Sequence, residues 1–81
     1  MIRVATFFSH YGAMRCKKLC DALGWRADLM PVPRSLSSSC GTCVRYEGGA
    51  LYPADDVPDE VEQIVAEVGG GYEALWRARN S

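Results

Sequence analysis

The pattern of hydrophobic and polar residues predicts a strand, a helix and a strand in the first part of the chain. Residues 2–8 are rich in β-branched and aromatic side chains, which is typical of a strand. On a helical wheel, residues 11–23 gather small and apolar side chains on one face: Gly12, Ala13, Cys16, Leu19, Cys20 and Leu23. Ser9 is the expected N-cap of this helix and Gly24 its expected end. Residues 25–32 predict the second strand, which Pro31 and Pro33 end.

The second part of the chain predicts a strand, a helix and a strand. Residues 43–46 are expected to be extended, after a loop over residues 33–41. A helix is expected to begin at Asp56 or Asp59, because apolar residues follow at i, i+4, i+7 and i+8 spacing. These residues are Val57, Val61, Ile64, Val65 and Val68. The glycines at 69–71 would end this helix, and residues 72–78 predict a last strand.

This order of elements predicts an α+β fold. The expected architecture is a ferredoxin-like β-α-β-β-α-β two-layer sandwich, a four-stranded sheet with two helices on one face. Right-handed crossovers would then bring Ser9 and His10 near the segment from Cys40 to Cys43.

Length and charge restrict the class of protein further. The 81 residues are enough for one domain, expected to span residues 1–81. The net charge is −1 with scattered Lys and Arg, so neither a nucleic acid nor an anionic membrane is an expected partner. There is no apolar run of about 20 residues, and residues 1–8 are too short for a signal peptide. We therefore expect a cytoplasmic protein, with sheet edges that allow a homodimer.

The loop that contains Cys40 is the main candidate for chemistry. The chain has four cysteines, and in a reducing compartment their thiols are core residues, metal ligands or reactive groups. Donors that can stabilise a thiolate or its cargo surround Cys40 in the sequence: Arg34, Ser37, Ser38, Ser39 and the backbone at Gly41. The alternative is a serine-rich turn with an incidental cysteine.

The remaining candidates have two readings each. Cys43 completes a Cys-x-x-Cys pair, which serves dithiol and metal sites, or it is a buried strand residue. Cys16 and Cys20 are four apart on one helix face, where core residues are the simpler interpretation. If a metal binds, its ligands would come from these four cysteines.

Three further polar residues are possible auxiliaries of the site. His10 and Ser9 stand at the junction between the first strand and the helix, and His10 is either a base or a solvated residue. Arg45 would share a strand face with Cys43 and supply a second cation, or lie at the surface. No phosphate loop, zinc-protease motif or Ser-His-Asp set is present, and no cofactor is expected.

The segment from Pro31 to Gly41 resembles a family of short bacterial and archaeal proteins, the selenium/sulfur carrier-like proteins. Its Pro-x-Pro-Arg-x-Leu-Ser-x-x-Cys-Gly block matches the family's central motif, and Phe8-Ser9 and Ala13-Met14 match weaker flanking positions. The resemblance implies a small α/β domain whose loop cysteine carries sulfur or selenium. Lys17 departs from a usually acidic position, and Cys16 and Cys43 from usually small apolar ones.

The loop and the resemblance together predict a carrier protein rather than an enzyme that turns over substrate. Cys40 would hold the chalcogen as a persulfide or selenopersulfide, and Cys43 would help to release it. Expected partners are donor and acceptor proteins, with a cysteine desulfurase-type enzyme as the donor. The alternatives are a thiol–disulfide redox or sensor module using Cys40 and Cys43, and a module that binds Zn or Cu(I).

Overall fold

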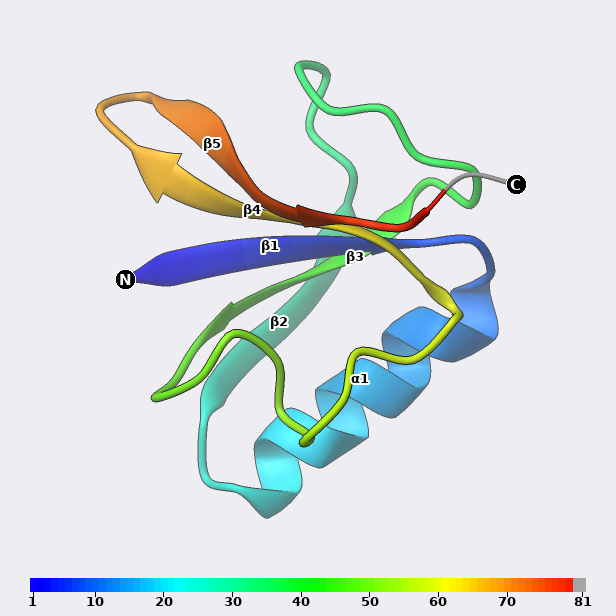
Figure 1. The fold of residues 1–81 in the computed structure, drawn as a ribbon, viewed down its shortest axis with the longest axis vertical. Coiled ribbons are helices and arrows are strands. Elements are labelled where there is room, and N and C mark those ends of the chain that lie inside the picture. The colour runs from blue at the N-terminus through cyan, green and yellow to red at the C-terminus, as the bar shows by residue number, and fades with distance from the viewer. Residues whose placement is uncertain (80–81) are drawn as a thin grey trace.

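The structure, a computed structural model, describes residues 1–79. These residues form one helix and one antiparallel sheet of five strands (Figure 1). The elements are β1 (Ile2–Phe7), α1 (His10–Ala22), β2 (Arg26–Pro31), β3 (Thr42–Glu47), β4 (Val61–Val68) and β5 (Gly71–Arg77). The strand order is β2-β3-β1-β4-β5, and every neighbouring pair is antiparallel.

The first strand and helix follow the sequence prediction closely. The Ser9 side chain accepts a hydrogen bond from the Gly12 backbone N–H at the start of α1. Gly24, just beyond the helix end, has a φ of 75°, a conformation that glycine adopts without strain. The buried face of α1 contains Gly12, Ala13, Cys16 and Cys20, as the wheel predicted, and Leu19 packs against the same core. Leu23, which the wheel placed on this face as well, is exposed because it lies at the end of the helix.

The helix covers one face of the sheet, which we call the helix face. Its core contains Phe7, Val44, Tyr46 and Ile64 from the strands, and the connection at residues 48–60 also runs on this side (Figure 1). Trp25 stacks on Tyr46 with ring centroids 6.2 Å apart. Burial of these large side chains supplies most of the hydrophobic stabilisation of so small a fold.

The opposite face, which we call the loop face, has a smaller core. Val4, Cys43 and Val65 are buried there, and Leu36 from the loop between β2 and β3 packs against them. This loop, residues 32–41, arches over the sheet on the side opposite α1 (Figure 1). The loop therefore substitutes for a second layer of helix.

The predicted second helix is wrong, because residues 61–68 form strand β4. The run is rich in Val and Ile, which lose side-chain freedom in a helix and suit a strand. A register shift also hides its strand period, because Glu62 is an extra residue of β4 opposite the Thr6–Phe7 step of β1. A bulge of this kind interrupts the two-residue alternation of a strand. The apolar residues of β4 are therefore spaced as they would be in a helix.

The ferredoxin-like sandwich is consequently wrong as well. The sheet has five strands instead of four, and residues 1–79 contain one helix instead of two. β4 is hydrogen-bonded to β1 and buries Val61 and Ile64 on the helix face and Val65 on the loop face. A segment with buried side chains on both sides has to be a central strand.

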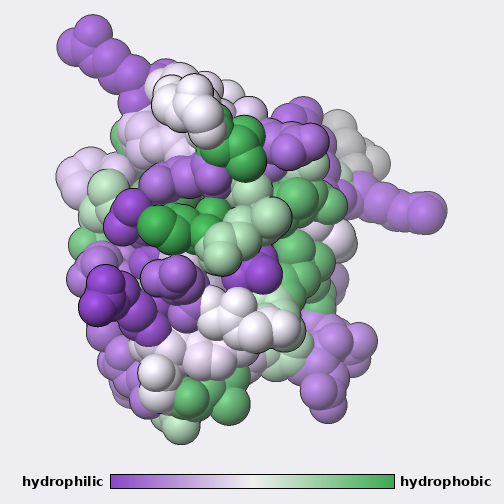
Figure 2. All heavy atoms as spheres, turned by 90° about the vertical axis from the view of Figure 1, so that its left-hand side faces the viewer, coloured by the Kyte–Doolittle hydropathy of each residue, from purple (hydrophilic) through white to green (hydrophobic). Residues whose placement is uncertain are grey.

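The surface at the end where the chain begins has a mixed character. Figure 2 views this side, where the N-terminus and the β4–β5 turn of Figure 1 lie, and shows small hydrophobic groups between hydrophilic side chains. Within residues 1–79, no helix has the length and apolar character needed to cross a membrane. The candidate residues gather at the opposite end, where β1 leads into α1.

Candidate functional site

Cys40 lies at the end of the β2–β3 loop and is half-buried. Its Sγ donates a hydrogen bond to the backbone carbonyl of Thr42 at 3.3 Å. The side chain packs against the edge of the helix-face core. Cys40 is therefore a thiol with one side on the protein and one side toward solvent.

The backbone around Cys40 is shaped by its neighbours. Gly41 has a φ of 77°, which favours glycine, and its carbonyl accepts a hydrogen bond from the Val32 N–H across the base of the loop. The Ser38 hydroxyl accepts from the Cys40 N–H at 3.4 Å and donates to the Phe7 carbonyl at 3.4 Å. Ser38 thus ties the cysteine backbone to the end of β1.

Glu62, the extra residue of the bulge in β4, holds the loop against the sheet through hydrogen bonds. Its carboxylate accepts from the Ser39 backbone N–H at 3.3 Å and from the Ser39 hydroxyl at 2.9 Å. The buried Thr6 hydroxyl donates to the same carboxylate at 3.2 Å. Next to it, Gln63 Nε2 donates to the Ser37 carbonyl at 3.0 Å. The bulge directs Glu62 toward the loop, which is a common use of bulges near functional sites.

His10 lies beside the cysteine loop, as the sequence predicted for the two segments. Its Nδ1 is 3.3 Å from the Thr42 Oγ1. The reason is the antiparallel pairing of β1 with β3, in which Thr6 stands opposite Cys43. Thr42 consequently contacts both candidates: its hydroxyl lies beside His10, and its carbonyl accepts the hydrogen bond from Cys40. The Ser9 hydroxyl is used as the N-cap of α1.

The two candidate arginines lie in different surroundings. Arg34 is exposed on the loop and, within residues 1–79, takes part in no hydrogen bond or ion pair. Arg45 is on the loop face, where its guanidinium donates to both oxygens of Glu67 at 2.6 and 3.1 Å. This contact lowers the pKa of Glu67 and raises that of Arg45. Arg45 is therefore occupied by an ion pair, whereas Arg34 is available.

Cys43 is buried and points to the loop-face core, away from the core against which Cys40 packs. Its Sγ lies 3.7 Å from the Pro31 carbonyl. Burial, and next the charge of a Cys40 thiolate, raise the pKa of Cys43 to about 11. At neutral pH Cys43 is a protonated thiol, and it is not disulfide-bonded to Cys40.

Cys16 and Cys20 belong to the helix-face core, and both are fully buried and free. The hydrogen bond with Cys20, followed by burial, raises the pKa of Cys16 far above its usual range. In the part of the chain that the structure describes, no three His, Cys, Asp or Glu side chains gather as a metal site would require. The cysteine pairs on α1 and on the loop remain apart.

Three residues near Cys40 were not singled out from the sequence: Thr42, Glu62 and Gln63. Glu62 and Gln63 were assigned to a helix, so their position beside the loop was not foreseeable. The available signal was the β-branched content of residues 61–68, which favours a strand but does not locate the bulge at Glu62.

The fold and the site describe a small antiparallel sheet that presents one accessible cysteine on a fastened loop. In comparisons with known proteins, the sequence model of the family described as "Putative Se/S carrier protein-like" matches residues 3–77. The chain belongs to this family, which confirms the resemblance noted from the Pro31–Gly41 block. Neither a curated protein nor a solved structure matches the chain.

Proposed function

We propose that Cys40 carries a sulfur or selenium atom as a persulfide or selenopersulfide. The observation that carries this proposal is the different exposure of the four cysteines, in a chain of the selenium/sulfur carrier-like family. Cys16, Cys20 and Cys43 are 0% exposed, and only Cys40 of the four reaches solvent. A carrier exchanges cargo with donor and acceptor proteins, so its cargo-bearing thiol has to be accessible.

Loading is an exchange of sulfur between thiols. Cys40 loses its proton, and the thiolate attacks the outer sulfur of a donor persulfide. The S–S bond of the donor breaks, its inner sulfur leaves as a thiolate that takes up a proton, and Cys40 retains the outer sulfur as a persulfide. One S–S bond forms and one breaks, so no oxidant is consumed. With a selenopersulfide donor the same step transfers selenium.

Loading requires the Cys40 proton to leave, and the hydrogen bond from the thiol to the Thr42 carbonyl has to break when it does. Thr42 holds the Cys40 thiol through its carbonyl and contacts His10 through its hydroxyl. His10 is thus the candidate acceptor of the proton. Arg34, exposed on the same loop, is the candidate cation for the terminal anion of the cargo.

The other donors predicted from the sequence hold the loop in place before cargo arrives. Ser38 and Ser39 donate to Phe7 and Glu62, Ser37 offers its carbonyl to Gln63, and Gly41 shapes the turn. Their proposed role is to keep Cys40 at the surface in a fixed position.

Release is the step in which Cys43 was expected to help. Its burial on the loop face and its raised pKa make it a poor nucleophile in the closed loop. These observations favour release to a thiolate of the acceptor protein, with Cys43 taking part only if the loop lifts from the sheet. The same separation gives a Cys40–Cys43 redox cycle little support.

The test is loading by an active cysteine desulfurase supplied with cysteine, followed by mapping of the modified peptides by mass spectrometry. We expect one added sulfur on Cys40, none on Cys40→Ser, and unchanged loading of Cys43→Ser. Iodoacetamide should label Cys40 first in the folded wild type, because the other thiols are buried. Absence of sulfur on Cys40 while the donor enzyme is active, or its appearance on another cysteine, would refute the proposal.

A further inference from the structure

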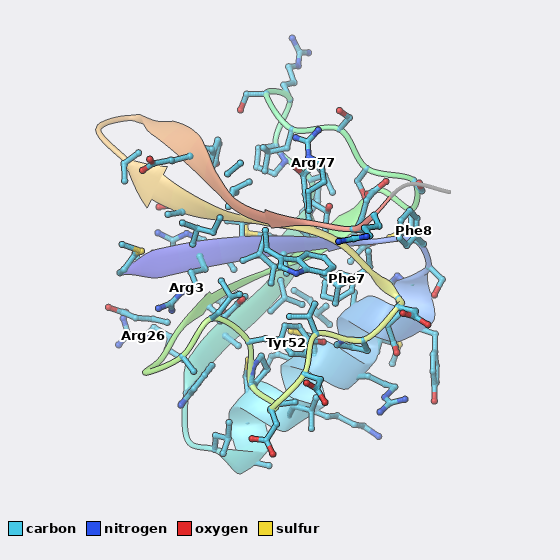
Figure 3. All side chains as sticks on the ribbon, in the orientation of Figure 1. Arg3, Phe7, Phe8, Arg26, Tyr52 and Arg77 are labelled. Atoms are coloured by element: carbon cyan, nitrogen blue, oxygen red, sulfur yellow. The ribbon has the colours of Figure 1, made fainter. Side chains whose placement is uncertain are left out.

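A cleft separates the β2–β3 loop from the β4–β5 hairpin on the loop face. Its volume is about 370 Å³, and its walls come from the end of β1, the loop, β4 and the end of β5. In Figure 3, Arg77 rises from β5 toward the loop and Phe8 lies at the end of β1 nearby. Cys40 does not line this cleft, so the cleft is separate from the proposed cargo position.

The charges of the cleft are unbalanced. Arg77 and Arg79 both line it, and within residues 1–79 neither guanidinium takes part in a hydrogen bond or ion pair. Glu62 also lines the cleft, but both of its oxygens already accept hydrogen bonds from Ser39, and one also accepts from Thr6. Two cations without partners therefore face a carboxylate that is already engaged, and the cleft as a whole favours an anion.

Neutral donors and an apolar wall complete the cleft. The side chains of Ser35 and Ser37 add hydroxyl groups from the loop. Leu36 and the half-exposed Phe8 supply apolar surface beside them. Two guanidinium groups with hydroxyl donors suit the oxygens of a phosphate or carboxylate, and an apolar wall suits the body of a small organic molecule.

We propose that this cleft binds a small molecule through an oxyanion group, a phosphate or a carboxylate, held by Arg77 and Arg79. The loop that contributes Ser35 and Ser37 also contains Cys40, so the ligand would bind to the same loop that presents the cargo. The proposal does not depend on what Cys40 carries, since the cysteine is outside the cleft.

The experiment is an NMR titration of the ¹⁵N-labelled full chain with sodium phosphate and, separately, sodium acetate, at ionic strength kept constant with chloride. We expect saturable shifts of the backbone amides at residues 35–37 and 77–79 with at least one anion, and the anion that binds identifies the group. Arg77→Gln should weaken binding about tenfold or more, because it removes charge-assisted hydrogen bonds. Arg26→Gln is the matched control, since Arg26 is exposed on β2 at the far edge of the sheet (Figure 3).

Shifts that do not saturate with either anion, or equal weakening by Arg77→Gln and Arg26→Gln, would overturn the proposal. The spectra also show whether each variant is folded, through amides remote from the cleft. Cys40→Ser should retain binding. Binding lost in Cys40→Ser but retained in Arg77→Gln would place the anion at the cysteine instead, and would refute the cleft while leaving the carrier proposal intact.

Discussion

The contact of Glu62 with the loop predicts a measurable coupling between two residues far apart in the sequence. Glu62→Ala removes the acceptor of the Thr6 hydroxyl, which is 0% exposed, and both contacts with Ser39. A buried hydroxyl left without a partner costs about 1–3 kcal/mol. The Ser39 contacts are exposed and add less, because water replaces them. We expect Glu62→Ala to lower the free energy of unfolding by about 2 kcal/mol.

Thr6→Val keeps the shape of the side chain but removes the hydroxyl that Glu62→Ala would leave without a hydrogen-bond acceptor. The double variant should therefore lose about 1 kcal/mol less than the sum of the two single variants, in urea unfolding experiments. The control is Glu73→Ala, since Glu73 is exposed on β5. A double variant whose loss equals the sum within about 0.5 kcal/mol would show that the contact does not stabilise the fold.

The same variant has a local effect at the cysteine. With Ser39 released from Glu62, the loop opens more easily, and Cys40 should react faster with iodoacetamide under native conditions. A change of about 1 kcal/mol in the free energy of loop opening corresponds to about a fivefold change in the rate of alkylation of Cys40. An unchanged rate in Glu62→Ala, together with an unchanged rate in Glu73→Ala, would mean that Glu62 does not control exposure of Cys40.

Two further predictions concern the rest of the fold. Gly48→Ala should lower the free energy of unfolding by about 1–3 kcal/mol, because the new Cβ would lie 2.0 Å from Cδ2 of the stacked Trp25 ring. Gly49→Ala, whose Cβ meets nothing within 4 Å, is its control, and equal stability of the two variants in urea would contradict the packing argument. Glu67→Gln should cost less than about 1 kcal/mol at neutral pH, since the ion pair with Arg45 is partly exposed. Arg45 lowers the pKa of Glu67 in the folded state, so the difference in free energy of unfolding between wild type and Glu67→Gln is complete above the carboxyl's unfolded pKa. It should vanish as the pH falls through the lowered folded-state pKa. A difference in stability that persists in acid would contradict the assignment.

The first half of the fold was predictable from local signals. The Ser9 N-cap, the apolar stripe of α1 and Gly24 agree on one helix, and each of them acts within a few residues. β1 is rich in β-branched and aromatic residues, and β2 ends at Pro31, where the sequence placed the end of the second strand. Where local preference and the fold point to the same element, sequence patterns suffice.

The second half was not predictable in the same way. The spacing of Val61, Ile64 and Val65 fits a helix, and only the pairing of β4 with β1 and β5 explains why the segment is extended. The bulge at Glu62 shifted its apolar positions out of strict alternation. Bulges depend on the partner strands, so they leave no reliable trace in one segment of sequence.

The candidate site, like the fold, was predictable from the sequence only in part. The residue types around Cys40 indicated a reactive loop, and membership of the selenium/sulfur carrier-like family confirmed the resemblance. The sequence did not indicate that Glu62 holds this loop, or that Cys40 and Cys43, three residues apart, pack on different faces of the sheet. Alternation along β3 turns Cys43 inward, whereas Cys40 precedes the strand and stays at the surface.

The sequence by itself determined the helix at His10–Ala22, the strands beside it and the loop that bears Cys40, because short-range capping, turn and side-chain preferences act within those segments. Only the tertiary structure decided that residues 61–68 are a central strand, that Glu62 binds the loop and that Cys43 is buried while Cys40 is not. These outcomes depend on which surfaces meet across the sheet, and that free energy is shared between segments distant along the chain.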